Sequence, residues 1–226
     1  MKYVFRVFWE AVKGLWDELF ILVLMNIVTL LLALPVVTFP PALAGLWNAA
    51  NLVAKGKSIH WSDYFEGFRN HFWKAWKLAL LNVLVAIIVF TNVRFYTPGI
   101  APFKINPTLS LWIQALFVGI ASLWLFIQLY PMALLLEQED QRVRLALRNA
   151  AVLFIINPGF TIVLALLLLL VAAVSTGFPV LWFVITLALF AVVCNKAVLH
   201  LLETYRERVR TEAEAGQELP DESEPG

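Results

Sequence analysis

The chain contains the uncharged stretch LFILVLMNIVTLLLALPVVTFPPALAGLWNAANLVA at residues 19–54, which the segment LPVVTFPP interrupts at residues 34–41. A transmembrane helix needs about 20 apolar residues, so these 36 residues exceed one helix and fall slightly short of two. The second half, Pro41–Ala54, therefore either crosses the membrane as a short helix or re-enters it without crossing. The topology of the whole chain depends on this choice.

Composition places the protein in the integral-membrane class. Hydrophobic residues make up 61% of the 226 residues and charged residues 15%, and the mean hydropathy is +0.79. A typical soluble domain has about 25% charged and 45–50% apolar residues. The net charge of +1 gives no reason to expect a nucleic-acid partner, and the single Cys194 excludes an intrachain disulfide. We also expect no cleavable signal peptide.

Further apolar segments follow the first stretch. Leu78–Val93 and Ile105–Leu136 are uncharged, and Asn149–Asn195 is uncharged throughout. Pro158-Gly159 and Gly177-Phe178-Pro179 divide the last of these into helices at about 160–176 and 180–199. The sequence thus predicts five clear spans in addition to Pro41–Ala54.

The basic residues favour a sixth crossing. With five spans, at most 12 of the 17 basic residues lie on the inner side of the membrane. If residues 41–54 also cross, 15 of the 17 lie inside, together with both termini. The predicted fold is therefore an all-α polytopic membrane helix bundle with six crossings, or five plus a re-entrant helix. We expect both termini on the inner, cytoplasmic side of the membrane.

This topology reveals a threefold pattern. An amphipathic stretch precedes each outgoing helix, at Tyr3–Glu18, Trp61–Lys77 and Asp140–Asn157. Such a stretch can lie in the membrane interface with its apolar face towards the acyl chains. We predict three units, each an interfacial helix followed by a helical hairpin, within one transmembrane domain at residues 1–210. The acidic tail at 211–226 has almost no apolar residues, so we expect it to be disordered.

Candidate site residues are amides and turn residues. Asn26, Asn48 and Asn82 lie within apolar segments, where amides either bond neighbouring helices or line a polar cavity for an uncharged solute. Pro35, Thr38 and Pro41 lie at the break, which is either a tight surface turn or irregular backbone with free carbonyls. Both alternatives stay open for each group.

Motifs for catalysis, cofactors and metals are missing from the sequence. Asp63, Glu66 and His71 are an acid/base candidate, but the interpretation that we favour is ion pairing with Arg69 and Lys74 on a solvated helix face. We therefore expect no catalytic, cofactor or metal site, and no enzyme activity.

Two segments have a recognisable pattern, namely Leu34-Pro35-Val36-Val37-Thr38 with the following Pro41–Leu46 (PALAGL), and Tyr64–Phe72 (YFEGFRNHF). They resemble the YesL-like family of bacterial membrane proteins, a domain of unknown function, so the expected location is a bacterial inner membrane. Pro40 stands where that family usually has glycine. The resemblance implies an integral membrane protein, often encoded near genes for carbohydrate uptake and degradation. It implies no known catalytic or binding residue.

The functional expectation is a non-enzymatic accessory or interaction protein linked to carbohydrate uptake. Its partners would be the lipid bilayer and a transporter or other membrane protein. The alternative is a small permease or channel for a neutral solute such as a sugar.

Overall fold

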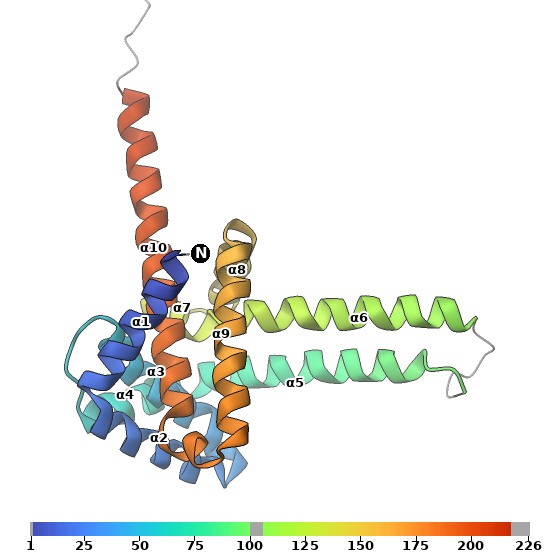
Figure 1. The fold of residues 1–226 in the computed structure, drawn as a ribbon, viewed down its shortest axis with the longest axis horizontal. Helices are drawn as coiled ribbons and strands as arrows, with labels where there is room; N and C mark the ends of the chain where they lie inside the picture. Colours follow the sequence, from blue (N-terminus) through green and yellow to red (C-terminus); the bar gives the residue numbers. More distant parts are fainter. Residues whose placement is uncertain (1, 100–105, 218–226) are drawn as a thin grey trace, which may run out of the picture.

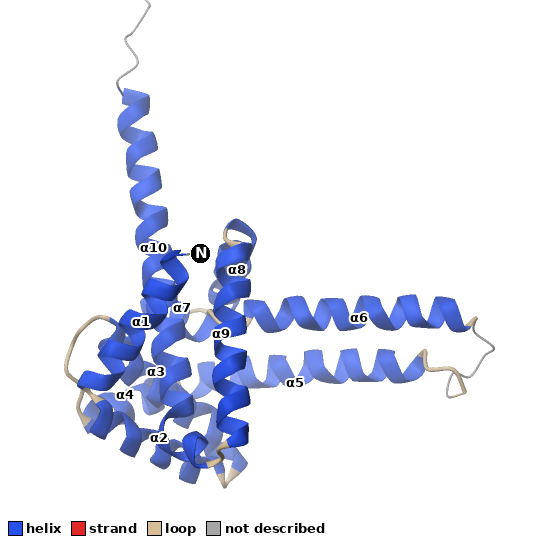
Figure 2. Cartoon of the chain, viewed as in Figure 1, coloured by secondary structure: helices blue, strands red, loops and turns tan. Residues whose placement is uncertain are grey.

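The structure, a computed structural model, describes residues 2–99 and 106–217, and all regular elements within them are helices (Figure 2). The first unit comprises α1 (Lys2–Asp17), α2 (Leu19–Ala33), a 3₁₀ turn (Val36–Thr38) and α3 (Phe39–Ala54). The second comprises α4 (Trp61–Asn70), α5 (Phe72–Phe95), α6 (Pro107–Ile127) and α7 (Pro131–Glu137). The third comprises α8 (Val143–Ile156), α9 (Pro158–Gly177), a π-helical turn (Trp182–Thr186) and α10 (Leu187–Gln217). The all-α prediction is confirmed.

The order of elements agrees with the predicted threefold pattern. In each unit a single non-helical residue separates the first helix from the second, namely Glu18, His71 and Asn157. The expected interfacial helix at Trp61–Lys77 was too long, because the chain breaks at His71 and residues 72–77 form the start of α5.

The first hairpin forms where the prolines predict it. Thr38 Oγ1 donates to the carbonyls of Leu32 and Pro35, which closes the turn after α2. Pro40 and Pro41 lie in the first turn of α3, where a backbone N–H has no helical acceptor and proline is tolerated. With the 3₁₀ turn, this helix forms a 19-residue candidate span, Val36–Ala54, whereas α2 has only 15 residues. The short member of the hairpin is therefore the outgoing helix and not the returning one.

The described residues contain five helices that are long and apolar enough to cross a membrane, or six if α1 and α2 count as one span. That pair bends by 92° at its break. The other candidates are Phe72–Phe95, Pro107–Glu137, Pro158–Gly177 and Trp182–Glu214. These long apolar helices identify a membrane-embedded protein.

The helices do not all run in one direction. The hairpin of α5 and α6 extends sideways from the body, across the direction of α9 and α10 (Figure 1). In the most apolar 18-residue stretch of each arm of this hairpin only 6% of the residues are buried, compared with 50% in Trp182–Glu214, which contains α10. The body therefore covers little more than the base of the hairpin. At that base Trp76 Nε1 donates to the Val37 carbonyl at 3.0 Å. This bond joins two positions that six upright crossings would assign to opposite membrane surfaces.

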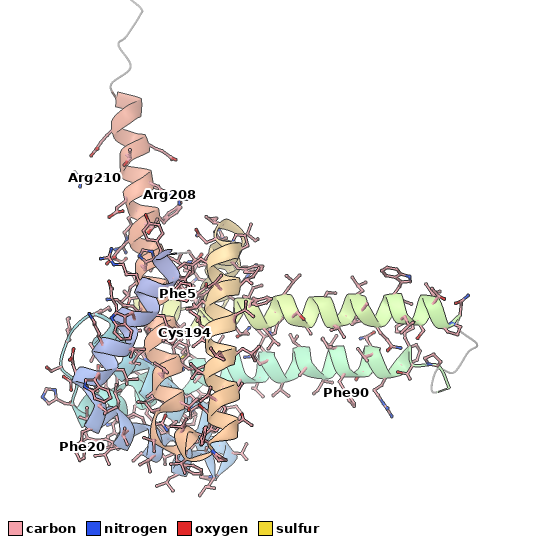
Figure 3. All side chains as sticks on the ribbon, in the orientation of Figure 1. Phe5, Phe20, Phe90, Cys194, Arg208 and Arg210 are labelled. Atoms are coloured by element: carbon pink, nitrogen blue, oxygen red, sulfur yellow. The ribbon has the colours of Figure 1, made fainter. Side chains whose placement is uncertain are left out.

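The core forms around the helices that end the three units. Helices α3, α7 and α10 contact one another, and α1 lies along α10 with Val4, Val7, Ala11 and Leu15 buried. Cys194 lies inside this core on α10 (Figure 3). Beyond the core, α10 projects away from the body with Arg208 and Arg210 on its free end (Figure 3).

The helix also runs further than the sequence suggests. Residues 211–217, the start of the expected disordered tail, continue α10, and residues 218–226 lie outside the described part of the chain.

Candidate functional site

The turn at the break satisfies its own hydrogen bonds. Pro35 is exposed, and both acceptors of the Thr38 hydroxyl lie within the turn. Pro41 is buried in the first turn of α3. Free carbonyls at the break were one of the two predicted alternatives. The Val37 carbonyl instead accepts a hydrogen bond from Trp76 Nε1 of α5. This geometry matches the tight-turn alternative.

Asn26 joins α2 to the π-helical turn and to the start of α10. Its side chain is fully buried, and Nδ2 donates to the carbonyls of Trp182 at 2.8 Å and Phe183 at 2.7 Å. Its Oδ1 accepts from the Ala188 amide at 3.0 Å. A π-helical turn shifts the backbone register and leaves groups without their usual partners, so this amide supplies partners that the helix lacks. All contacts of Asn26 are therefore structural.

Asn48 and Asn82 bind other elements. Asn48 Nδ2 donates to the Asp63 carbonyl at 2.8 Å and holds the start of α4 on α3. Asn82 Oδ1 accepts from Trp124 Nε1 at 2.8 Å, and its Nδ2 donates to Gln128 Oε1 at 3.3 Å. The three predicted amides thus occupy three separate places, and they do not line one shared cavity.

A groove of about 490 Å³ nevertheless lies beside Asn82. It runs between the start of α3, the base of α5 and the break between α6 and α7. Its walls are mainly aromatic and aliphatic, and the amides of Asn82 and Gln128 are its polar groups. Residues that form these walls include Phe39, Leu43, Trp47, Ala79, Val83 and Met132. This size and lining are usual for sites that take apolar or amphiphilic groups.

The three residues of the acid/base candidate, Asp63, Glu66 and His71, form hydrogen bonds with separate neighbours and not with one another. Asp63 Oδ2 accepts from the His60 amide at 2.7 Å, and Glu66 accepts from Asn70 Nδ2 at 3.4 Å. His71 is buried, with Nδ1 3.3 Å from the Gly67 carbonyl. Burial, followed by the charge of Lys74, lowers the pKa of His71 below its ordinary value.

Sequence reasoning missed a polar junction at the centre of the molecule. Asn51 of α3 donates through Nδ2 to Glu137 Oε1 at 2.6 Å and to Asn195 Oδ1 at 3.1 Å. Lys55 Nζ forms an ion pair with the same Glu137 oxygen at 2.6 Å. One residue from each of α3, α7 and α10 therefore meets here. All three are polar residues in the returning part of their unit, and this shared position is the feature of the sequence that could have indicated the junction. Such a fully bonded cluster fixes how the three helices pack.

One family model matches part of the chain. The family described as "Protein of unknown function, DUF624" matches residues 19–93, which run from α2 into the last turn of α5. The expected resemblance to a domain of unknown function is confirmed over this segment. Most residues that line the groove lie within it. No curated protein and no solved structure matches the chain.

Proposed function

We propose that this protein is a non-enzymatic accessory protein of a bacterial inner membrane that binds another membrane protein through the α5–α6 hairpin. The observation that carries this proposal is the hairpin's exposed apolar surface. Large apolar side chains point away from both helices, including Leu80, Ile87 and Phe90 on α5 and Leu111, Leu116 and Leu125 on α6. Figure 3 shows Phe90 on this arm, far from the core that holds Cys194. Contiguous apolar surface of this extent is typical of membrane or protein contact sites.

One face of α6 suits a partner helix. Ala115, Gly119 and Ser122 are exposed at helical spacing, and a Cβ placed on Gly119 would meet no atom within 4 Å. Small residues let two helix backbones approach closely in a membrane, where apolar burial alone gives little driving force. The apolar groove at the base of the hairpin lies next to this arm and can receive side chains of the same partner.

The partner that we propose first is a transporter for carbohydrate uptake. This choice rests on the YesL-like resemblance of the LPVVT and YFEGFRNHF segments. The orientation that we propose, with both termini in the cytoplasm, rests on the distribution of the basic residues.

A pair of matched variants tests the proposal. Gly119→Leu fills the small-residue face and should reduce the amount of membrane partner that co-purifies with the protein. Val174→Leu enlarges an exposed residue of α9, outside the hairpin, and should leave co-purification unchanged. A photoreactive residue at Phe90 should crosslink to the same partner. Equal recovery of the partner with both variants, together with no crosslink from Phe90, would contradict the proposal.

The alternative function, a small permease for a neutral solute such as a sugar, predicts a different result. Reconstituted vesicles would then show saturable sugar flux without any partner. That observation would replace the accessory role, whereas co-purification of a transporter without intrinsic flux would support it.

A further inference from the structure

A second cavity lies at the end of the molecule where α10 leaves the core. It has a volume of about 590 Å³ and lies between the start of α1, the turn after α3 and one face of α10. Charged residues and one histidine dominate its lining, namely Arg6, Glu10, Lys55, Lys196, His200, Glu203 and Glu207. The proposed partner-binding hairpin contributes no residue to this cavity, so the inference below is independent of the proposed function.

Positive charge gathers at the inner end of the cavity. Lys196 Nζ lies 3.5 Å from Glu10 Oε2, and Arg6 Nε lies 2.9 Å from Glu10 Oε1. Lys55 pairs with Glu137. The hydrogen bond from Arg6, aided by the charge of Lys196, holds the pKa of Glu10 below its ordinary value. Three cations therefore share two carboxylates, and the inner end keeps one net positive charge.

Negative charge lies at the outer end. Glu203 and Glu207 follow Lys196 by seven and eleven residues along the face of α10 that lines the cavity. At about 1.5 Å per residue, they lie roughly 10 and 16 Å further along the helix axis. Neither carboxylate has an ion pair within the described residues. The cavity is thus polarised along α10.

This polarity is aligned with the membrane boundary. Lys196 is the first charged residue after the uncharged stretch 149–195, so it marks the level at which α10 leaves the apolar layer. Glu203 and Glu207 lie further towards water. Tyr3 stacks on His200 at 6.1 Å between ring centroids and forms an aromatic wall beside them. An ammonium group is attracted both by carboxylates and by an aromatic face.

We propose that this cavity binds the phosphoethanolamine headgroup of a phospholipid. The phosphate lies near Lys196, Arg6 and Lys55 at the membrane boundary. Only two methylene groups separate the phosphate ester oxygen from the ammonium, so the ammonium reaches Glu203, the nearer carboxylate, and Glu207 adds negative charge beyond it. The flexible ethylene link lets the ammonium take the water side of the phosphate, which matches the charge order of the cavity. A purely anionic headgroup would satisfy the inner end and meet two carboxylates at the outer end.

Native mass spectrometry of the purified full-length protein tests this inference. The probes are phosphatidylethanolamine and phosphatidylglycerol with identical acyl chains. We expect the unmodified protein to retain phosphatidylethanolamine preferentially, by roughly fivefold for the contact between the ammonium and Glu203. The double variant E203Q/E207Q should lose this preference. The control variant E212Q, on the same helix beyond the cavity, should keep it.

Three results would overturn the inference. The first is equal retention of the two lipids by the unmodified protein. The second is an unchanged preference in E203Q/E207Q when its thermal unfolding equals that of the control. The third is competition by soluble phosphoethanolamine at the same concentration as the lipid, which would assign the cavity to a free solute.

Discussion

At the scale of single residues, burial changes what a polar side chain does. Asn26 and Asn82 look alike in the sequence, because both are amides in uncharged segments. In the structure, Asn26 bonds to three backbone groups at the π-helical turn, whereas Asn82 joins α5 to α6 beside a groove. Losing Asn26 leaves buried backbone groups without partners, and each such group costs about 1–3 kcal/mol.

His71 gives a prediction at the same scale. Its lowered pKa means that the unfolded chain takes up a proton more readily than the folded protein does. The stability that this group contributes is therefore present above its ordinary pKa of about 6.5 and is lost as the pH falls below that value. We expect the melting temperature in detergent to fall between about pH 7.5 and about pH 5.5, and to fall less in His71→Gln.

The thiol of Cys194 provides the measurement. It is the only cysteine in the chain and is buried, so a thiol-reactive dye labels it on unfolding. His60→Gln changes an exposed histidine at the opposite end of α4 and should keep the pH dependence of the unmodified protein. Identical slopes for His71→Gln and the unmodified protein would show that His71 is not the titrating group.

At the scale of elements, the close contact of α3 with α4 depends on two glycines. A Cβ on Gly45 would lie 2.6 Å from the Tyr64 carbonyl oxygen, and a Cβ on Gly67 would lie 2.4 Å from Asn48 Cβ. Both glycines lie within residues 19–93, the segment that matches the family of unknown function. Helix packing at this distance requires their missing side chains.

Gly67→Ala should consequently destabilise the protein by about 1–3 kcal/mol, because the new methyl group forces α4 away from α3. Thermal unfolding followed by Cys194 labelling measures the change. Gly159→Ala is the matched control, since a Cβ there meets nothing within 4 Å. A Gly67→Ala protein as stable as the control would mean that α4 can move without cost.

At the scale of the whole molecule, the direction of α3 determines which loops share a side of the membrane. Its 19-residue apolar span separates the turn at Val37 from the loop at Ser58, and both residues are exposed. We expect a cysteine introduced at Val37 to react with an impermeant reagent in intact cells. A cysteine at Ser58 should react only after permeabilisation, because the basic residues place that loop in the cytoplasm.

Labelling of both positions from the same side would show that Val36–Ala54 re-enters the membrane. The bond between Trp76 and Val37 makes this experiment informative, since it places the base of the hairpin level with the turn. A cysteine at Lys77, which is exposed one residue beyond Trp76, would then report the side on which α5 begins.

The sequence alone determined the class of the protein, the order of its helices and most of their ends. These properties are local, because hydropathy, proline and glycine act within a few residues of their positions. Pro35–Pro41 marks the first turn, and Pro158 marks the start of α9. The errors in helix boundaries lie at His71 and at the end of α10. Apolar periodicity continues across the break at His71, which tertiary packing stabilises, and a helix that is already formed extends into residues 211–217 at low cost.

Only the tertiary structure decided which polar groups meet. The junction of Asn51, Glu137 and Asn195 joins residues from three units, and no local pattern indicates that they touch. The sideways direction of the α5–α6 hairpin and the polarised cavity beside α10 likewise depend on how whole helices pack. Long-range side-chain contacts decide such packing, and hydropathy reports only that each helix is apolar.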